Sequence, residues 1–515
     1  MTSRATLALL GAEVRTLDPR RPRATAVAVG GDRILAVGDD AEIRALCDAR
    51  TEVLDLAGAA VVPGLVDAHM HPLWAADLTE GADCTEVTSL PELGAALRAE
   101  RNGSEAIARG WGVDYGVFAG AALDGRALEE LAGGPALIAF FDLHTHLATP
   151  AVLARAGVDG PVALPDNGEV VCDGGVPTGE LREFSAYERV ARALPAATPA
   201  ERVERMAGIL RTLNAAGLTG AHVMDGTPAT FEALRELEAT DRLTMRLVVP
   251  LVVTAGTDAG EQDALVALRG ERGRLWRGGV AKFFLDGVIE TGTAWLEVPD
   301  TRGGGTRPVW PDPDEYAASV ARFAGAGFQV ATHAVGDRAV RAVLDAYRAA
   351  PSSPGVRHRI EHLETLGDET LARLAEEDVV ASMQPVHMRW TRLDATDEWS
   401  VRLGPERAAR GWRVGDIHAS GACVALGSDW PVAPYDPRLG MAWARRRLSA
   451  IAALEGYTTG PARAVSEEDE SGRIAPGMRA DLTSLSQDPV DVPASELEGL
   501  AAGLTIVAGR IVHSK

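Results

Sequence analysis

Short apolar segments alternate with amphipathic helical segments through the centre of this 515-residue chain. Eight of the apolar segments have the length of buried strands, and helical patterns separate most of them. The eight predicted strands are residues 61–71, 218–225, 246–253, 280–286, 328–333, 357–362, 379–384 and 423–429. Strands that alternate with helices form parallel sheets, and eight such units make a barrel. The sequence therefore predicts an α/β protein built on a (β/α)8 TIM barrel.

The two ends of the chain differ from this centre, because they contain short β-prone segments and few helical patterns. Neither end is long enough to form an independent domain. We expect residues 1–60 and 476–515 to form one composite β-sandwich domain beside a barrel of residues 61–475. The gap after the first predicted strand is too long for a simple crossover. It predicts an insertion subdomain at about 75–200, placed over the mouth of the barrel.

Charge and cysteine content exclude several classes of protein. The net charge is −22, from 51 basic and 73 acidic residues, which argues against nucleic-acid and anionic-membrane partners. The four cysteines are scattered, so a disulfide framework and a structural zinc knuckle are not expected. No signal segment and no apolar run of membrane-spanning length is seen. We expect a cytoplasmic protein with a small-molecule substrate, and a homodimer is the assembly to test first.

Residues that bind metals recur near the ends of the predicted strands. The first strand ends in His69 and His71, which would project together because side chains two apart share one face of a strand. Later strands contribute Lys282, Asp286, His333, His362 and Asp429. The carboxyl ends of barrel strands meet at one mouth, where barrel active sites are built. Four histidines and a carboxylate suit Zn²⁺ or a similar divalent ion.

Lys282 predicts more than one metal ion. Burying a lysine as a cation is costly, and a neutral amine can react with CO₂ to form a carbamate. The carbamate would be an anionic ligand able to bridge two metals, which together activate a hydroxide and polarise a carbonyl. Asp429 would then bind one metal and move the proton from the attacking water to the leaving group.

Each of these residues also has a purely structural interpretation. Lys282 would extend to solvent or pair with Asp286. His333 and His362 would be hydrogen-bonded core histidines, and Asp429 would cap a turn. Five separate strands nevertheless carry such residues in order, which favours one shared metal site.

The motifs resemble those of the amidohydrolase superfamily. Residues 63–71 (PGLVDAHMH) are similar to its entry motif, and residues 474–482 (IAPGMRADL) are similar to its return into a terminal β-sandwich. Other motifs resemble the branch that contains N-substituted formamide deformylase, amidohydrolase family 3. These are residues 177–181, 282–287, 333–339, 357–362 and 427–432. The resemblance covers nearly the whole chain and implies a metal-dependent hydrolase of C–N bonds, often with a carboxylated lysine.

Two departures from the family pattern bear on the substrate. Residues 288–293 read Val-Ile-Glu-Thr-Gly-Thr, where the family often shows Ser followed soon by Arg-Thr. Residues 142–144 read Asp-Leu-His, where Asp-Gly-His is common. The resemblance implies that His144 reaches the substrate. Further candidate substrate contacts are Trp111, Glu180, Asp286, His387 and Trp430.

The sequence thus predicts a metal-dependent amidohydrolase that cleaves an amide- or formamide-like C–N bond by metal-activated hydroxide. The predicted ligands of two Zn²⁺ ions are His69, His71, Lys282, His333, His362 and Asp429, and Asp429 is the general acid and base. A deaminase with one metal ion and a cyclic amide or ester hydrolase are the alternative enzymes. A non-catalytic barrel scaffold is the alternative from another class.

Overall fold

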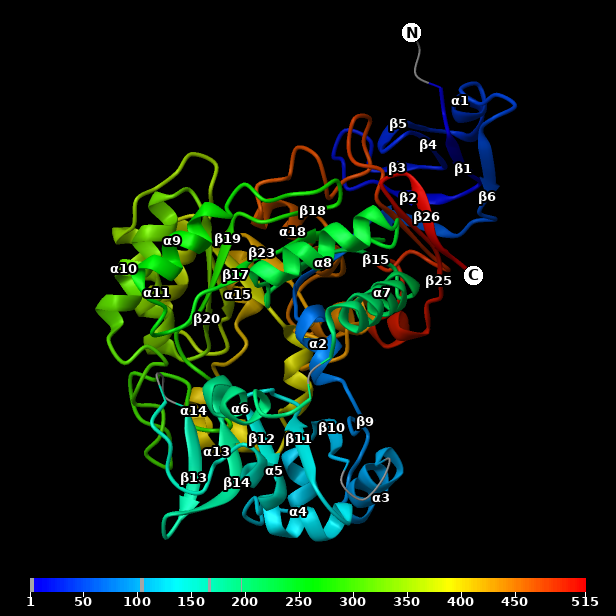
Figure 1. Ribbon diagram of the computed structural model, residues 1–515. Helices are drawn as coiled ribbons and strands as arrows, with labels where there is room; N and C mark the ends of the chain where they lie inside the picture. The colour runs from blue at the N-terminus through cyan, green and yellow to red at the C-terminus, as the bar shows by residue number, and fades with distance from the viewer. Residues whose placement is uncertain (1–3, 102–105, 165–167, 196) are drawn as a thin grey trace.

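The computed structural model describes residues 4–101, 106–164, 168–195 and 197–515. Figure 1 shows strands and helices in the centre, the insertion on one side (cyan), and the two chain ends together on another. Residues 1–3 of the predicted N-terminal segment lie outside the described residues. So do residues 102–105, 165–167 and 196 of the predicted insertion.

All eight predicted central segments contain strands, and neighbouring strands pair in parallel. The strands are β8 (Leu65–Met70), β15 (Leu218–Val223), β16 (Arg246–Val248), β17 (Leu251–Val252), β19 (Val280–Phe284), β20 (Gln329–Ala334), β21 (Arg359–His362), β22 (Val380–Met383) and β23 (Val424–Leu426). The intervening helices are α7 (Pro199–Ala215), α8 (Pro228–Ala239), α9 (Ala259–Ala267), α10 (Pro313–Gly325), α11 (Asp337–Ala349), α12 (Asp368–Glu376), α13 (Glu398–Leu403), α14 (Pro405–Ala408) and α15 (Val414–Ala419). This alternation is the TIM-barrel type of α/β fold.

The hydrogen-bonded ladder is divided into two sheets, and the described residues do not form one closed barrel. One sheet has the order β18-β16-β15-β8, where β18 is Trp276–Arg277, and the other has the order β17-β19-β20-β21-β22-β23. Pro250, which has no N–H to donate, separates β16 from β17. At the other junction, Asp67 of β8 accepts a 3.1 Å hydrogen bond from the backbone N–H of Ser428. The N–H of Asp429 donates to the carbonyl of His69.

The predicted first strand, residues 61–71, is split at Gly64. Its first part forms β7 (Ala60–Pro63), which pairs with β24 (Leu482–Leu485) of a terminal sheet. Only its second part, β8, joins the central strands. A Cβ atom at Gly64 would lie 2.3 Å from the Thr219 hydroxyl oxygen, so glycine permits this close crossing between the two sheets.

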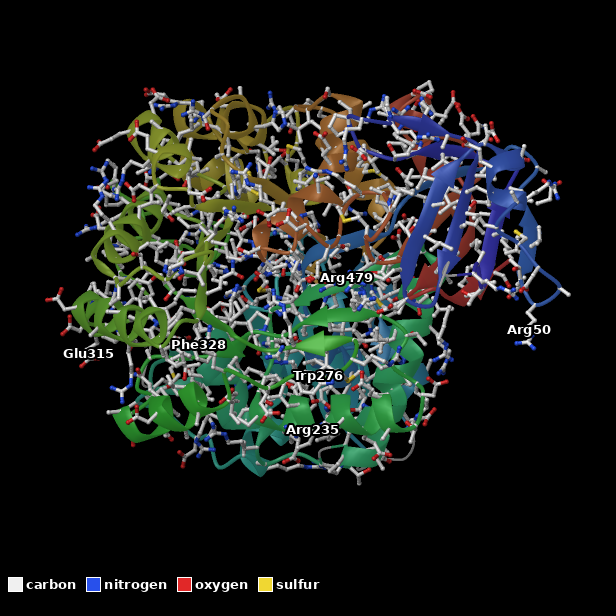
Figure 2. The ribbon with its side chains drawn as sticks, turned by 90° about the horizontal axis from the view of Figure 1, so that it is seen from above. Arg50, Arg235, Trp276, Glu315, Phe328 and Arg479 are labelled. Atoms are coloured by element: carbon white, nitrogen blue, oxygen red, sulfur yellow. The ribbon has the colours of Figure 1, made fainter. Side chains whose placement is uncertain are left out.

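The two ends of the chain (blue and red in Figure 2) form two sheets, one of N-terminal strands alone and one of strands from both ends. Their orders are β5-β4-β1-β6 and β26-β25-β24-β7-β2-β3. The bounds are β1 (Leu7–Leu10), β2 (Glu13–Arg15), β3 (Arg23–Ala24), β4 (Ala26–Gly30), β5 (Arg33–Gly38), α1 (Asp40–Arg44), β6 (Glu52–Asp55), η3 (Ala494–Gly499), β25 (Ala502–Val507) and β26 (Arg510–Ser514). Leu9 and Val27 of the first sheet share one apolar cluster with Val61, Leu482 and Ile506 of the second.

The insertion forms a six-stranded sheet with the order β13-β14-β12-β11-β10-β9. Its elements, which follow α2 (Pro72–Leu78), are β9 (Ala82–Asp83), α3 (Leu90–Glu100), β10 (Ala108–Val113), η1 (Tyr115–Phe118), α4 (Gly125–Ala132), β11 (Ala136–Phe140), β12 (Thr145–Ala148), α5 (Pro150–Arg155), β13 (Glu169–Asp173), β14 (Val176–Arg182) and α6 (Glu183–Ala191). The later loops contain η2 (Pro385–Trp390), α16 (Pro437–Ala444), α17 (Ala450–Glu455) and α18 (Thr459–Ala464). No helix among the described residues combines the length and hydropathy needed to cross a membrane.

Candidate metal centre

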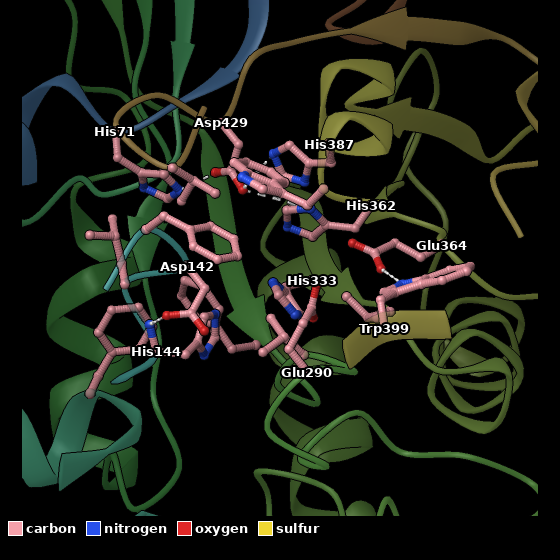
Figure 3. Close-up of a pocket in the computed structure, with 18 of the residues that line it drawn as sticks. His71, Asp142, His144, Glu290, His333, His362, Glu364, His387, Trp399 and Asp429 are labelled. Atoms are coloured by element: carbon pink, nitrogen blue, oxygen red, sulfur yellow. Dashed lines mark hydrogen bonds and ion pairs between the residues drawn. The ribbon is translucent and has the colours of Figure 1, made fainter. Parts of the chain in front are cut away.

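A cavity lies at the carboxyl ends of the central strands (Figure 3). Segments that are far apart in sequence contribute to its wall, including the loop after β11 and the loops after β20, β21 and β23. Six predicted site residues line it: His71, His144, His333, His362, His387 and Asp429. The strand ends therefore meet as the spacing of the polar residues predicts.

Asp429 lies beside three of the predicted histidine ligands. Its Oδ1 is 3.2 Å from Nε2 of His69 and 2.9 Å from Nε2 of His71. Its Oδ2 is 3.9 Å from Nδ1 of His362. His69, His362 and Asp429 each offer one ligand atom, and these three atoms lie within 4.8 Å of one another. That spacing is small enough for the three side chains to bind a common ion.

Four of these side chains carry buried polar atoms with no hydrogen-bond partner among the described residues. The atoms are Nε2 of His69, Nδ1 of His71, Nζ of Lys282 and Oδ1 of Asp429. Unpaired buried polar atoms are rare in folded proteins, and several at one place call for an explanation. A divalent cation would satisfy imidazole nitrogens and a carboxylate oxygen together, so the residues present fit a metal.

Burial also sets protonation states that suit metal binding. It lowers the pKa of His71 to about 4 and holds the pKa values of His333 and His362 well below the ordinary value. These imidazoles are neutral at pH 7 and keep a lone pair for a metal. Burial lowers the pKa of Lys282 to about 8, which increases the fraction of neutral amine at pH 7. For Asp429 burial opposes ionisation, but the neighbouring histidines outweigh it, and its pKa is well below the ordinary value.

A buried network that the sequence analysis missed orients His69. Oε2 of Glu361 lies 2.6 Å from Nδ1 of His69, so that Nε2 faces Asp429. Arg359 donates from Nε to Oε1 of Glu361 at 2.6 Å and from Nη1 to Nδ1 of His222 at 2.8 Å. Burial raises the pKa of Glu361, but Arg359 and His69 outweigh it and hold that pKa far below the ordinary value. The Arg-x-Glu spacing on β21 was the available signal, because side chains two apart share a face.

His144 reaches the cavity from the insertion. Its Nδ1 lies 2.7 Å from Oε2 of Glu183, and its ring centre lies 5.6 Å from that of His333. Burial lowers the pKa of His144, but Glu183 outweighs this effect and the pKa rises to about 9. His144 is therefore an imidazolium at pH 7, beside the neutral histidines. Glu183 was not predicted from the sequence. Its backbone φ is 64°, and no local sequence pattern indicates this conformation.

The remaining predicted substrate contacts divide into residues at or next to the cavity and residues away from it. His387 lines the cavity, with Nε2 3.7 Å from Oδ2 of Asp429. Asp286 lies next to the cavity, 3.7 Å from Nε2 of His333. Its carboxylate accepts hydrogen bonds from the backbone N–H groups of Trp295, Val335 and Gly336, so it holds the loops together.

Trp111, Glu180 and Trp430 are not among the described residues that line the cavity. Trp111 lies on β10 of the insertion. Glu180 is paired with Arg182 at 2.7 Å. Trp430 packs edge-to-face against Tyr435.

Comparisons with known proteins agree with this geometry. A model of the amidohydrolase family matches residues 52–513. N-substituted formamide deformylase of Arthrobacter pascens is 28% identical over 557 aligned positions, which cover 100% of this chain and 99% of that protein.

Two solved structures show the same TIM-barrel type of fold. A metal-dependent hydrolase of Pyrococcus furiosus superposes with a TM-score of 0.73 and 25% identity, over 94% of this chain and 100% of that chain. One of Pyrococcus horikoshii has a TM-score of 0.75 and 23% identity, over 95% and 99% of the two chains. With a family match from residue 52 to residue 513, the chain belongs to the amidohydrolase family and is a metal-dependent enzyme that hydrolyses carbon–nitrogen bonds other than peptide bonds.

Proposed function

We propose that this enzyme hydrolyses an amide- or formamide-like C–N bond and that Asp429 is its general acid and base. The observation that carries the proposal is the group of buried, unpartnered ligand atoms around Asp429. The similarity to N-substituted formamide deformylase over the whole chain supports the choice of bond. Cyclic amides and esters are the neighbouring substrate classes to be compared.

The residues that would hold the metal are His69, His71, Lys282, His333, His362 and Asp429. We propose two Zn²⁺ ions per chain and a carboxylated Lys282, because a buried amine with a lowered pKa can take up CO₂. Bound divalent ions polarise a carbonyl oxygen and lower the pKa of water to about 7.

Asp429 is placed to move protons. It is a buried carboxylate at pH 7, and its Oδ1 has no hydrogen-bond partner among the described residues. Asp429 accepts a proton from the water that attacks the carbonyl carbon. It then passes that proton to the leaving nitrogen, which departs as a neutral amine.

His144 is proposed to stabilise negative charge on the substrate oxygen. As an imidazolium held by Glu183, it can donate a hydrogen bond from Nε2 into the cavity. His387 lies across the same cavity and is proposed as a substrate contact.

One observation favours the one-metal deaminase as a second candidate. The compact group of His69, His362 and Asp429 would be sufficient to hold a single ion. The metal content per chain separates the two candidates, and ammonia release from ring C–N substrates would support the deaminase.

The test combines elemental analysis with a hydrolysis screen of N-formyl, N-acyl, lactam and ester compounds. We expect two equivalents of a divalent metal and hydrolysis of an N-formyl or N-acyl compound, abolished by a chelator. Turnover that survives complete metal removal would contradict the proposal.

The β-sandwich domain of residues 1–60 and 476–515, the cytoplasmic location and the homodimer remain predictions from the sequence.

A further inference from the structure

The wall of the cavity carries carboxylates that have no lysine or arginine partner among the described residues. Asp142, Glu290 and Glu364 come from the loops after β11, β19 and β21. No lysine or arginine is among the described residues that line the cavity. None lies within ion-pair distance of these three carboxylates in the described part of the chain. Figure 3 shows Glu290 and Glu364 away from His71, across the cavity.

Burial makes the lack of a cation costly for Glu290 and Glu364. The Asp142 carboxylate instead accepts hydrogen bonds from the Tyr115 hydroxyl and from the backbone N–H groups of His144 and Thr145. Glu364 is only 7% exposed, and one carboxylate oxygen accepts a 2.7 Å hydrogen bond from Nε1 of Trp399. Burial, together with Asp142 nearby, raises the pKa of Glu290 to about 7. Buried carboxylates are normally paired with a cation or a metal. A cationic ligand would supply the missing charge.

Aromatic rings form the rest of this wall. Phe141 stacks on Trp390 with ring centres 4.4 Å apart, and Trp399 stacks on Trp412 at 5.8 Å. The faces of tryptophan rings attract ammonium groups. Trp412 gives an independent sign of a ligand, because it is 7% exposed and its Nε1 has no hydrogen-bond partner among the described residues.

We propose that Glu290, Glu364, Trp390 and Trp412 form a cation subsite, and that the substrate is an amide bearing a second, protonated nitrogen. The proposal rests on the hydrolysis proposed above and names its substrate class. The metal ligands and the His144 imidazolium attract the carbonyl oxygen at one side of the cavity. The ammonium group is drawn to Glu290 and Glu364, away from His71, so charge orients the substrate.

The first test uses three amides of equal length: N-formylputrescine, N-pentylformamide and an N-formylaminopentanoate. They end in an ammonium, a methyl and a carboxylate group. We expect kcat/KM to be roughly 10- to 100-fold higher for the ammonium compound than for the methyl compound, as hydrogen bonds to charged groups allow. Equal values for the two would overturn the cation subsite and leave the hydrolase intact.

Variants test which carboxylates cause the preference for the ammonium compound. Glu290→Gln and Glu364→Gln should each reduce the ratio of ammonium to methyl kcat/KM, and Glu290→Arg should reverse the preference toward the carboxylate compound. Glu315→Gln, an exposed glutamate on α10, is the matched control and should keep the wild-type ratio. A ratio that stays at the wild-type value in both Gln variants would overturn the assignment.

A binding measurement keeps this inference separate from hydrolysis. Butylammonium chloride should change the tryptophan fluorescence of the metal-loaded enzyme saturably, and sodium butyrate should not. The affinity for butylammonium should fall roughly tenfold or more in Glu290→Gln. If no amide is hydrolysed but butylammonium binds in this way, only the proposed reaction fails. Equal responses to the two salts would overturn the subsite.

Discussion

The carboxyl ends of the parallel strands carry buried polar atoms without hydrogen-bond partners among the described residues, whereas their amino ends carry ion-paired arginines. At the carboxyl ends, His69, Lys282 and Asp429 present buried atoms that have no hydrogen-bond partner in the part of the chain that the structure describes. At the amino ends, arginines are neutralised by carboxylates from elsewhere in the chain. Arg246 pairs with Asp481 at 2.5 Å, Arg277 with Glu467 at 2.6 Å, and Arg357 with Glu468 at 2.9 Å.

This difference separates function from stability within one set of strands. Glu467 also pairs with Arg479, which precedes β24, so the amino-end pairs connect the central strands to the terminal sheets. Paired groups contribute to the folded state and have no free atoms to offer a ligand. Unpaired buried groups reduce stability and remain available for chemistry. Substitutions at the two ends should therefore have separable effects.

The largest effect is expected for Asp429→Asn. The amide cannot accept the proton of the attacking water, so kcat should fall by roughly 10²- to 10⁴-fold. Elemental analysis of the same sample should still find the bound metal. The control is Asp378→Asn at the amino end, where the carboxylate pairs with Arg357. Near wild-type turnover in Asp429→Asn would remove its role as the general base.

The next effect concerns the residue behind His69. Glu361→Gln removes the charge that orients the imidazole, and metal affinity should fall by roughly 10- to 100-fold. Competition with a chelator measures this change. Glu377→Gln, another hydrogen-bonded glutamate, should keep the wild-type affinity. Unchanged affinity in Glu361→Gln would show that the pair only supports the fold.

The smallest effect is expected at the amino end. Glu467→Gln weakens two arginine pairs, and the free energy of unfolding should fall by roughly 1 to 2 kcal/mol with kcat unchanged. Burial raises the pKa of Glu467, but Arg277 and Arg479 outweigh it and lower that pKa below its ordinary value of 4.5. Its contribution is therefore present above pH 4.5 and lost as the pH falls through the lowered pKa.

Urea unfolding of wild type and Glu467→Gln at pH 7 and under acid conditions measures this difference. The two proteins should converge as the pH falls. A constant difference at every pH, or a loss of kcat in the variant, would break the separation between the two ends.

The strand ends could be predicted from the sequence, because residues that bind metals recur at or near the ends of apolar segments. The split of residues 61–71 at Gly64 could not be predicted in this way. It depends on the close approach of Gly64 to Thr219, which lies far along the chain. Loop residues such as Glu183, Glu290 and Glu364 converge only in three dimensions. A tryptophan beside a motif, such as Trp430, does not reveal which side its ring faces.

The most direct test of the metal centre is the number of metal equivalents bound per chain in wild type and in Lys282→Ala. We expect two equivalents in the wild type and one or fewer in the variant, with partial recovery when a short carboxylic acid replaces the missing ligand. A wild type without metal, or the same number in both proteins, would contradict the proposed two-metal site.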